Sequence, residues 1–150
     1  MKEQLITKNK KAYFNYNFIT TYIAGIILTG TEIKSIRQHK CSLVDTYCYI
    51  KNNEIFIKNS YIAKYENSGY CTHEERRDRK LLLTKQEIKK LNKECQNPGY
   101  TIIPIKIFIN EKGLCKIELA LCKGKKQYDK RETIKQKDIN RDIDRILKNY

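Results

Sequence analysis

An abrupt change in composition at Lys123 limits how this chain folds. Before it, apolar and β-branched residues recur in short, strand-like runs. From Lys123 to Tyr150 the chain has ten Lys and Arg against five Asp and Glu, and few apolar residues. A segment this polar buries too little surface to offset the entropy that ordering costs. We therefore expect a folded body followed by a basic tail, residues 123–150, that is disordered when free.

The tail nevertheless carries a helical pattern. Five of its apolar residues fall on one stripe of an α-helix: Ile139, Ile143, Ile146, Leu147 and Tyr150. A basic segment with a latent apolar stripe suggests folding on a large anionic partner.

The overall charge points to the same kind of partner. The 150 residues carry a formal charge of +14, and the pI is near 9.5. Such an excess indicates a polyanionic ligand. Nucleic acid is the first interpretation, with an anionic membrane surface and a merely solubilising surface as alternatives. Because the chain has neither a run of eighteen apolar residues nor the apolar core of a signal peptide, we expect a cytoplasmic protein without membrane spans.

The cysteines do not predict a metal site or a disulfide framework. None of the six has C-x-x-C spacing, and several stand where Val or Ala would serve in a strand or on a helix. We expect free thiols buried as small hydrophobic groups. Cys71 and His73 leave half a metal site as an alternative. His39 and His73 lack a catalytic setting, and His73 beside Glu74 is typical of a solvated turn. We therefore expect no enzyme, no cofactor and no metal.

The body reads as a mainly β domain with short helices, of the α+β class. Strand-like runs cover residues 13–22, 25–30, 43–51, 54–60, 100–109 and 114–122. The pair Asn52–Asn53 predicts a tight hairpin between two of them. About six antiparallel strands over roughly 110 residues indicate a small closed or half-closed barrel like an oligonucleotide-binding (OB) fold. The expected organisation is a basic segment 1–12, a barrel 13–122 and a tail 123–150.

Two helices have recognisable starts. Thr31 is expected to cap the first, with Glu32 in its first turn and Ile33 and Ile36 facing inward. The second begins with a T-x-x-E capping box, Thr84 to Glu87. Its buried stripe is expected to comprise Ile88, Leu91 and Cys95, and Pro98–Gly99 to stop it.

Four blocks of this sequence occur together, in the same order, in one known family. They are N-K-K-A at 9–12, G-I-I-L-T-G-T-E-I-K-S-I-R at 25–37, R-K-L-L-L at 79–83 and G-K-K-Q-Y-D-K-R-E at 124–132. From about Asn9 to its end, the chain resembles the bacterial SsrA-binding protein family, small protein B.

The resemblance implies an OB-like barrel and a role in trans-translation. Such proteins bind transfer-messenger RNA (tmRNA, or SsrA RNA) at its tRNA-like domain and deliver it to stalled ribosomes. Their tail enters the decoding centre of the small-subunit rRNA and the empty mRNA channel, where it becomes helical. They act as carriers and mimics of a tRNA arm, and we expect a monomer.

The resemblance also implies RNA-binding residues in the body: Lys10, Lys11, Glu32, Lys34, Arg37, Arg79, Lys80, Leu82, Thr84 and Lys85. A carboxylate such as Glu32 can accept hydrogen bonds from base amino or imino groups, although it also suits a helix start. Leu82 can pack on an unstacked base, but the leucine triplet also reads as core strand. Thr84 is the expected helix cap, and Lys10 and Lys11 also fit a solvated segment.

The ribosome-binding residues implied for the tail are Gly124, Lys125, Lys126, Tyr128, Asp129, Lys130, Arg131, Lys135, Lys137 and Arg141. Gly124 lets the chain leave the barrel, Lys125 and Lys126 meet rRNA phosphates, and the Tyr128 ring stacks on a base. A helix over 133–150 would be roughly 27 Å long. A ribosomal or tRNA-binding protein with a similar barrel and extension is the alternative.

Overall fold

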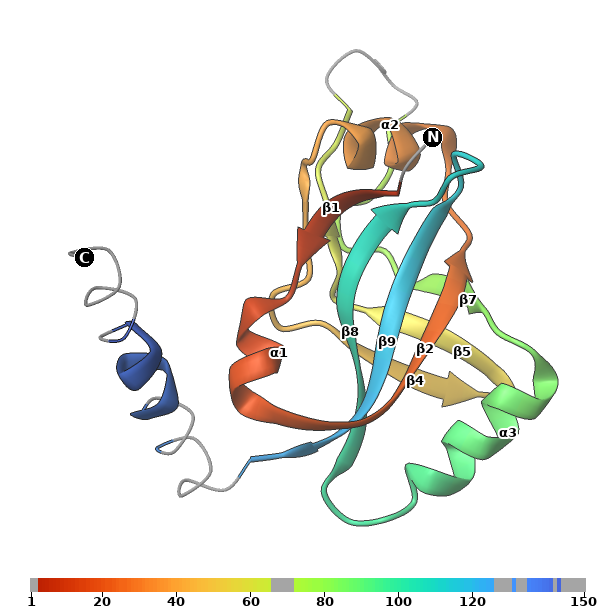
Figure 1. The fold of residues 1–150 in the computed structure, drawn as a ribbon. Coiled ribbons are helices and arrows are strands. Elements are labelled where there is room, and N and C mark those ends of the chain that lie inside the picture. The colour runs from red at the N-terminus through yellow and green to blue at the C-terminus, as the bar shows by residue number, and fades with distance from the viewer. Residues whose placement is uncertain (1–2, 66–71, 126–130, 132–134, 142, 144–150) are drawn as a thin grey trace.

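The structure is a computed structural model that describes residues 3–65, 72–125, 131, 135–141 and 143 (Figure 1). The described residues form nine strands and three helices with assigned bounds. In chain order these are β1 Gln4–Lys8, α1 Lys10–Asn15, β2 Tyr16–Ile26, α2 Gly30–Arg37, β3 Cys41–Ser42, β4 Tyr47–Lys51, β5 Glu54–Lys58, β6 Tyr61–Ile62, β7 Arg79–Leu82, α3 Lys85–Glu94, β8 Tyr100–Ile109 and β9 Cys115–Gly124. Residues 131, 135–141 and 143 are helical as well.

The main sheet is antiparallel and barrel-like. Its pairings run from β8 to β4, β5, β7, β2 and β9, and β9 pairs again with β8. Long ladders join β2 to β9 and β9 to β8, whereas a single residue pair, Cys48 with Ile102, joins β4 to β8. The predicted OB-like architecture is confirmed, with β1, β7 and the small β3–β6 pair added to the expected strands.

The predicted hairpin is also confirmed. β4 and β5 pair from Tyr47 with Lys58 to Lys51 with Glu54. Asn52 and Asn53 join them with φ of 53° and 60°, the left-handed conformation that a two-residue hairpin turn requires.

Alternation along the strands fills the barrel. Ile55 and Ile57 of β5, Leu81 of β7, and Ile117, Leu119 and Leu121 of β9 are all at most 1% exposed. Ile88 and Leu91 of α3 join this core, as predicted, and half-buried Cys95 packs against it. Pro104 lies within β8 and has no N–H to donate. The strand continues past it because the register with β9 shifts between Pro104 and Lys106.

Helix α2 begins earlier than predicted. Its cap is Thr29, not Thr31: the Thr29 hydroxyl accepts from the Glu32 N–H, and the Glu32 carboxylate accepts from the Thr29 N–H. This is a capping box, so Glu32 has a local backbone partner that the shorter helix would not have given it. The equivalent box from Thr84 to Glu87 at α3 is confirmed.

The N-terminal boundaries differ most from expectation. Gln4–Lys8, placed in a basic segment outside the barrel, forms β1 and pairs with β8. Residues 13–15, read as strand, belong to α1, which Asn9 caps by accepting from the Ala12 N–H. The apolar run at 25–30 is not a separate buried strand, since β2 ends at Ile26 and Ile27 is 48% exposed. Similarly, β4 starts at Tyr47 rather than at 43, after Asp45 with its φ of 55°.

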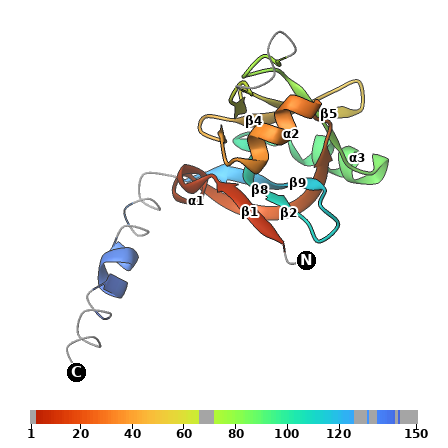
Figure 2. The same ribbon diagram turned by 90° about the horizontal axis from the view of Figure 1, so that it is seen from above.

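The helices lie around the barrel rather than inside it. In both views α1 and α3 stand at opposite sides and α2 lies across one end (Figures 1 and 2). Within the part of the chain that is described, no helix is long and apolar enough to cross a bilayer.

Candidate RNA-binding surface

Strand β7 divides its residues between the interior and the surface. Arg79 and Leu81 point inward and are at most 1% exposed, whereas Leu82 is 53% exposed. Gly25 pairs with Leu82 on the neighbouring strand β2. A Cβ on Gly25 would lie 3.3 Å from Leu82 Cβ and Cδ1. Because Gly25 has no Cβ, the Leu82 side chain has space on the surface beside it.

A hollow of about 560 Å³ lies between β7, the start of α3 and the β4–β5 turn. Its lining combines apolar walls with amides, ammonium groups and one carboxylate: Asn52, Asn53, Glu54, Lys80, Leu81, Leu82, Leu83, Lys85, Ile88 and Lys89. Three of the predicted RNA-binding residues, Lys80, Leu82 and Lys85, meet here. Hydrophobic walls with amides and cations suit a nucleotide, whose base needs contact and whose phosphate needs charge.

Helix α3 continues this basic surface. Lys85, Lys89 and Lys93 recur every four residues and are exposed, so they share one face of the helix. None of them makes a salt bridge among the described residues. Lys89 and Lys93 were not predicted, although the capping box at Thr84 and the four-residue spacing could have shown them. Thr84 itself is occupied as the cap.

Glu32 and Arg79 do not lie on this surface. Both side chains are 0% exposed, and Arg79 Nε donates to a Glu32 carboxylate oxygen. The other oxygen accepts from Arg77 Nη2 at 2.7 Å and from the Thr29 N–H at 2.9 Å. The expectation that Glu32 and Arg79 touch RNA directly does not fit their burial. Their side chains instead hold α2 to β7.

Hydrogen bonds to the pair decide its charge state. Burial alone would raise the pKa of Glu32, but the bonds from Arg77, the Thr29 N–H and Arg79 outweigh it and leave that pKa below its usual value. Arg79 Nη1 donates to the Ser60 carbonyl at 2.9 Å and to its hydroxyl at 2.8 Å. A buried pair this well bonded remains ionised.

His73 belongs to the same buried region, not to a solvated turn as predicted. It is 7% exposed, and its Nε2 donates to the Ile62 carbonyl over 2.9 Å. The other ring nitrogen, Nδ1, forms a hydrogen bond with the Thr31 hydroxyl, also at 2.9 Å, and a hydroxyl can either donate or accept there. His73 thereby ties the segment before β7 to α2. No local sequence pattern indicated that His73 would be buried, because its partners Thr31 and Ile62 are distant along the chain.

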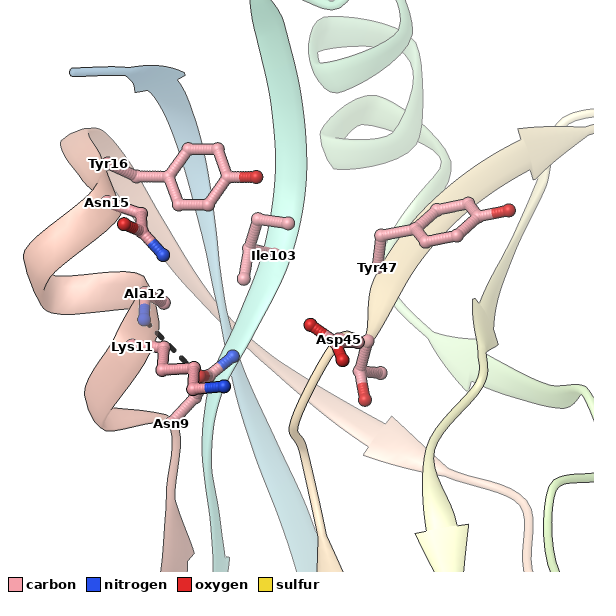
Figure 3. Close-up of a pocket in the computed structure, with 9 residues that line it drawn as sticks. Asn9, Lys11, Ala12, Asn15, Tyr16, Asp45, Tyr47 and Ile103 are labelled. Carbon is pink, nitrogen blue, oxygen red and sulfur yellow. Dashed lines mark hydrogen bonds between the residues drawn. The ribbon is translucent and has the colours of Figure 1, made fainter. Parts of the chain in front are cut away.

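The predicted residues of the N-terminal motif lie on the other side of the barrel. Lys10 and Lys11 are exposed on α1, while Asn9 is buried and donates from Nδ2 to the Pro104 carbonyl. A groove of about 270 Å³ separates α1 from the start of β4, with Ile103 at its base (Figure 3). Lys11 and Asp45 line opposite sides of it (Figure 3). The lysines keep a setting suitable for a phosphate but are apart from the β7–α3 surface.

The remaining predicted residues are scattered. Lys34 and Arg37 are exposed on α2, and the Lys34 ammonium lies 5.3 Å from the centre of the Tyr65 ring. Gly124 ends β9, and the Lys125 backbone N–H donates to the Asn15 carbonyl at 2.8 Å. Arg131, Lys135, Lys137 and Arg141 are exposed and helical. Lys126, Tyr128, Asp129 and Lys130 lie outside the described residues.

The described cysteines are free, as predicted. Cys48 and Cys122 are buried, and Cys41, Cys95 and Cys115 half-buried; Cys71 lies outside the described residues. Burial raises the pKa of Cys41 to about 11 and those of Cys115 and Cys122 to about 12. Among residues with a described placement, no three His, Cys, Asp or Glu side chains gather as a metal site would require.

Comparison with known proteins decides the family. The family described as SmpB protein matches residues 6–149. The chain belongs to the SmpB family. The SsrA-binding protein of Phocaeicola vulgatus is 60% identical over 141 residues, covering 94% of either chain. That of Bacteroides thetaiotaomicron is 57% identical with the same coverage.

A solved structure agrees with this membership. The chain from the work described as "tmRNA-SmpB: a journey to the center of the bacterial ribosome" is 38% identical and superposes with a TM-score of 0.69. The match covers 85% of the present chain and 93% of the other. The similarity to this family therefore includes the fold of the barrel as well as the sequence.

Proposed function

We infer that this chain binds SsrA RNA, the transfer-messenger RNA, and serves trans-translation on stalled ribosomes. The observation that carries the inference is the family match over residues 6–149, with relatives named SsrA-binding protein at up to 60% identity. The charge of +14 and the lysines of the β7–α3 surface supply the electrostatic attraction that RNA binding requires. We propose a cytoplasmic carrier rather than an enzyme, because ribosomes are its site of action.

The proposal divides the work between two regions. The barrel holds the tRNA-like domain at the β7–α3 surface, where Leu82 contacts a base and Lys80, Lys85 and Lys89 contact phosphates. The tail from Gly124 enters the decoding centre and the empty mRNA channel and contacts rRNA. Ile139 and Ile143 are 52% and 49% exposed, so the described part of the tail leaves its apolar stripe available for such a partner.

RNA binding tests the first half. Labelled tRNA-like domain of SsrA RNA is titrated with the full chain, with ordinary tRNA in a parallel titration. Tighter binding of the tRNA-like domain supports the proposal. Equal affinity for the two RNAs would favour a general tRNA-binding or ribosomal protein instead.

Peptide tagging on stalled ribosomes tests the second half. Replacing Asp129, Lys130 and Arg131 together by Ala should abolish tagging while RNA affinity stays within a few-fold of the wild type. Lys112→Ala, in the exposed turn between β8 and β9, is the matched control and should tag normally. A large loss of RNA affinity in the triple variant would contradict the division of labour.

A further inference from the structure

The outer face of β4, β5 and β7 carries an aromatic pair that neither the family blocks nor the hollow includes. Tyr49 of β4 lies directly opposite Phe56 of β5. Their ring centres are 5.4 Å apart and their planes differ by 23°, a stacked arrangement. Both rings are only half-buried, because the core takes the alternate residues Cys48, Ile55 and Ile57.

The Tyr49 ring is held in one orientation. The Tyr49 hydroxyl donates to Asp78 Oδ2 at 2.8 Å, and this bond raises the pKa of Tyr49 above its usual value. The ring is thereby fixed at its outer end as well as at its Cβ. A ring that is already fixed loses little entropy when a flat ligand stacks on it.

Lysines surround the rings. Lys80 lies opposite Phe56 on β7, and Lys58 lies opposite Tyr47 on β4. Lys51 extends the row to the turn. Along these three strands the outward residues are Tyr47, Tyr49, Lys51, Glu54, Phe56, Lys58, Lys80 and Leu82. They include three cations and one anion, and that anion, Glu54, bridges Lys80 at 3.3 Å.

The lysines around the pair distinguish this face from ordinary hairpin packing. A cross-strand aromatic pair stabilises a hairpin by itself, but it does so without needing cations beside it. Half-buried rings with cations on both sides form a different kind of surface, because the rings offer π-faces to bases and the ammonium groups attract phosphates. The face also adjoins the hollow, whose lining shares Glu54, Lys80 and Leu82 with it.

We propose that Tyr49 and Phe56 form a stacking platform for an unpaired RNA base, with Lys51 and Lys58 contacting the flanking phosphates. This rests on the proposed function and extends it: the platform binds a single-stranded stretch that continues from the RNA held at the β7–α3 surface. Stacking accepts any base, so the platform adds affinity without sequence preference.

The test compares a base-bearing ligand with a baseless one. The full chain is titrated with a labelled six-nucleotide oligouridylate and with an abasic ribose-phosphate oligomer of equal length. The double variant Tyr49→Leu/Phe56→Leu should bind the oligouridylate about 10-fold more weakly, with an unchanged salt slope, and the abasic oligomer as the wild type does. Lys51→Ala/Lys58→Ala should lower the salt slope by about 1.4, since each single-strand phosphate contact contributes about 0.7.

Two controls isolate the stacking. Tyr49→Phe keeps the ring and should bind the oligouridylate within about 2-fold of the wild type. Ile19→Ala removes an apolar side chain that is 50% exposed on β2 and should leave binding unchanged. Ring-proton NMR shifts of Tyr49 and Phe56 in the wild type, on addition of the oligouridylate, give the same answer without any substitution, should the double variant fail to fold.

The outcomes separate this proposal from the function beneath it. Equal losses on the oligouridylate and the abasic oligomer, or ring protons that do not shift, overturn the platform. If the same wild-type preparation then binds the tRNA-like domain, the proposed function stands without the platform. Wild-type protein that binds no SsrA RNA overturns the function itself, whatever the oligouridylate shows.

Discussion

Arg79 and Lys80 are neighbours on β7, yet they belong to two regions with opposite demands. Arg79 is enclosed and donates to Glu32, to Ser60 and to the carbonyls of Glu74 and Glu75, which lie on three segments of the chain. Lys80 faces solvent with Lys85 and Lys89 around the hollow. In the first region the charged groups are paired with other groups of the protein, so substitutions there should change the free energy of unfolding. The second retains cations for an external ligand and can be tested through RNA binding.

The largest expected effect is on the enclosed region. Glu32→Gln leaves the Arg79 guanidinium buried without its counter-charge, and loss of one partner of a buried pair costs about 3–5 kcal/mol. Urea denaturation of the full chain measures this as a drop in the free energy of unfolding. A loss below about 1 kcal/mol would show that Glu32 is not needed to hold α2 to β7.

Acid should weaken the same region selectively. Because the folded-state pKa of Glu32 lies below its usual value of 4.5, its contribution is full above that pH and is lost as the pH falls towards the folded pKa. The stability difference between wild type and Glu32→Gln should therefore shrink between pH 6 and pH 3.5. Urea denaturation at both pH values measures it, and a difference that grows in acid would contradict this charge state.

The surface lysines should change binding and leave folding intact. Lys85→Ala/Lys89→Ala removes two phosphate contacts, so the salt slope for the tRNA-like domain should fall by about 1.4–1.8. The thermal midpoint should stay at the wild-type value, since both side chains are exposed. Lys112→Ala is the matched control, and an equal change in its slope would mean that only net charge matters.

The smallest expected effect is on a salt bridge within the solvent-facing region. Glu54→Gln breaks the bridge to Lys80 between side chains that are 46% and 39% exposed, and exposed bridges contribute less than about 1 kcal/mol. Urea denaturation should therefore barely distinguish this variant from the wild type. A cost as large as that of Glu32→Gln would remove the contrast between the enclosed and the solvent-facing charges.

The sequence allowed the solvent-facing region to be predicted better than the enclosed one. The Asn52–Asn53 turn and the Thr84 capping box are local signals that the structure confirms. Lys80 and Lys85, which the resemblance implied, both line the hollow beside them. The enclosure of Arg79 depends on Glu32, forty-seven residues earlier, and no local pattern marks such a pair. The block at 79–83 had suggested two surface cations, whereas the alternation along β7 turns one of them inward.

The N-terminus shows a second limit. Gln4–Lys8 is too polar to be recognised as a strand, because only Ile6 of its five residues is buried. Its pairing with β8 supplies the backbone partners that its side chains do not indicate. Similarly, Asn9 follows that strand and caps α1, and its Nδ2 also donates to the Pro104 carbonyl far along the chain.

The short pairing between β4 and β8 places a cysteine where local opening of the barrel can be measured. The only thiol in that pairing, among the strands described, is Cys48, whose burial also keeps it protonated at neutral pH. Strands part first where the fewest bonds join them. Alkylation of Cys48 should therefore report how often β4 and β8 separate locally.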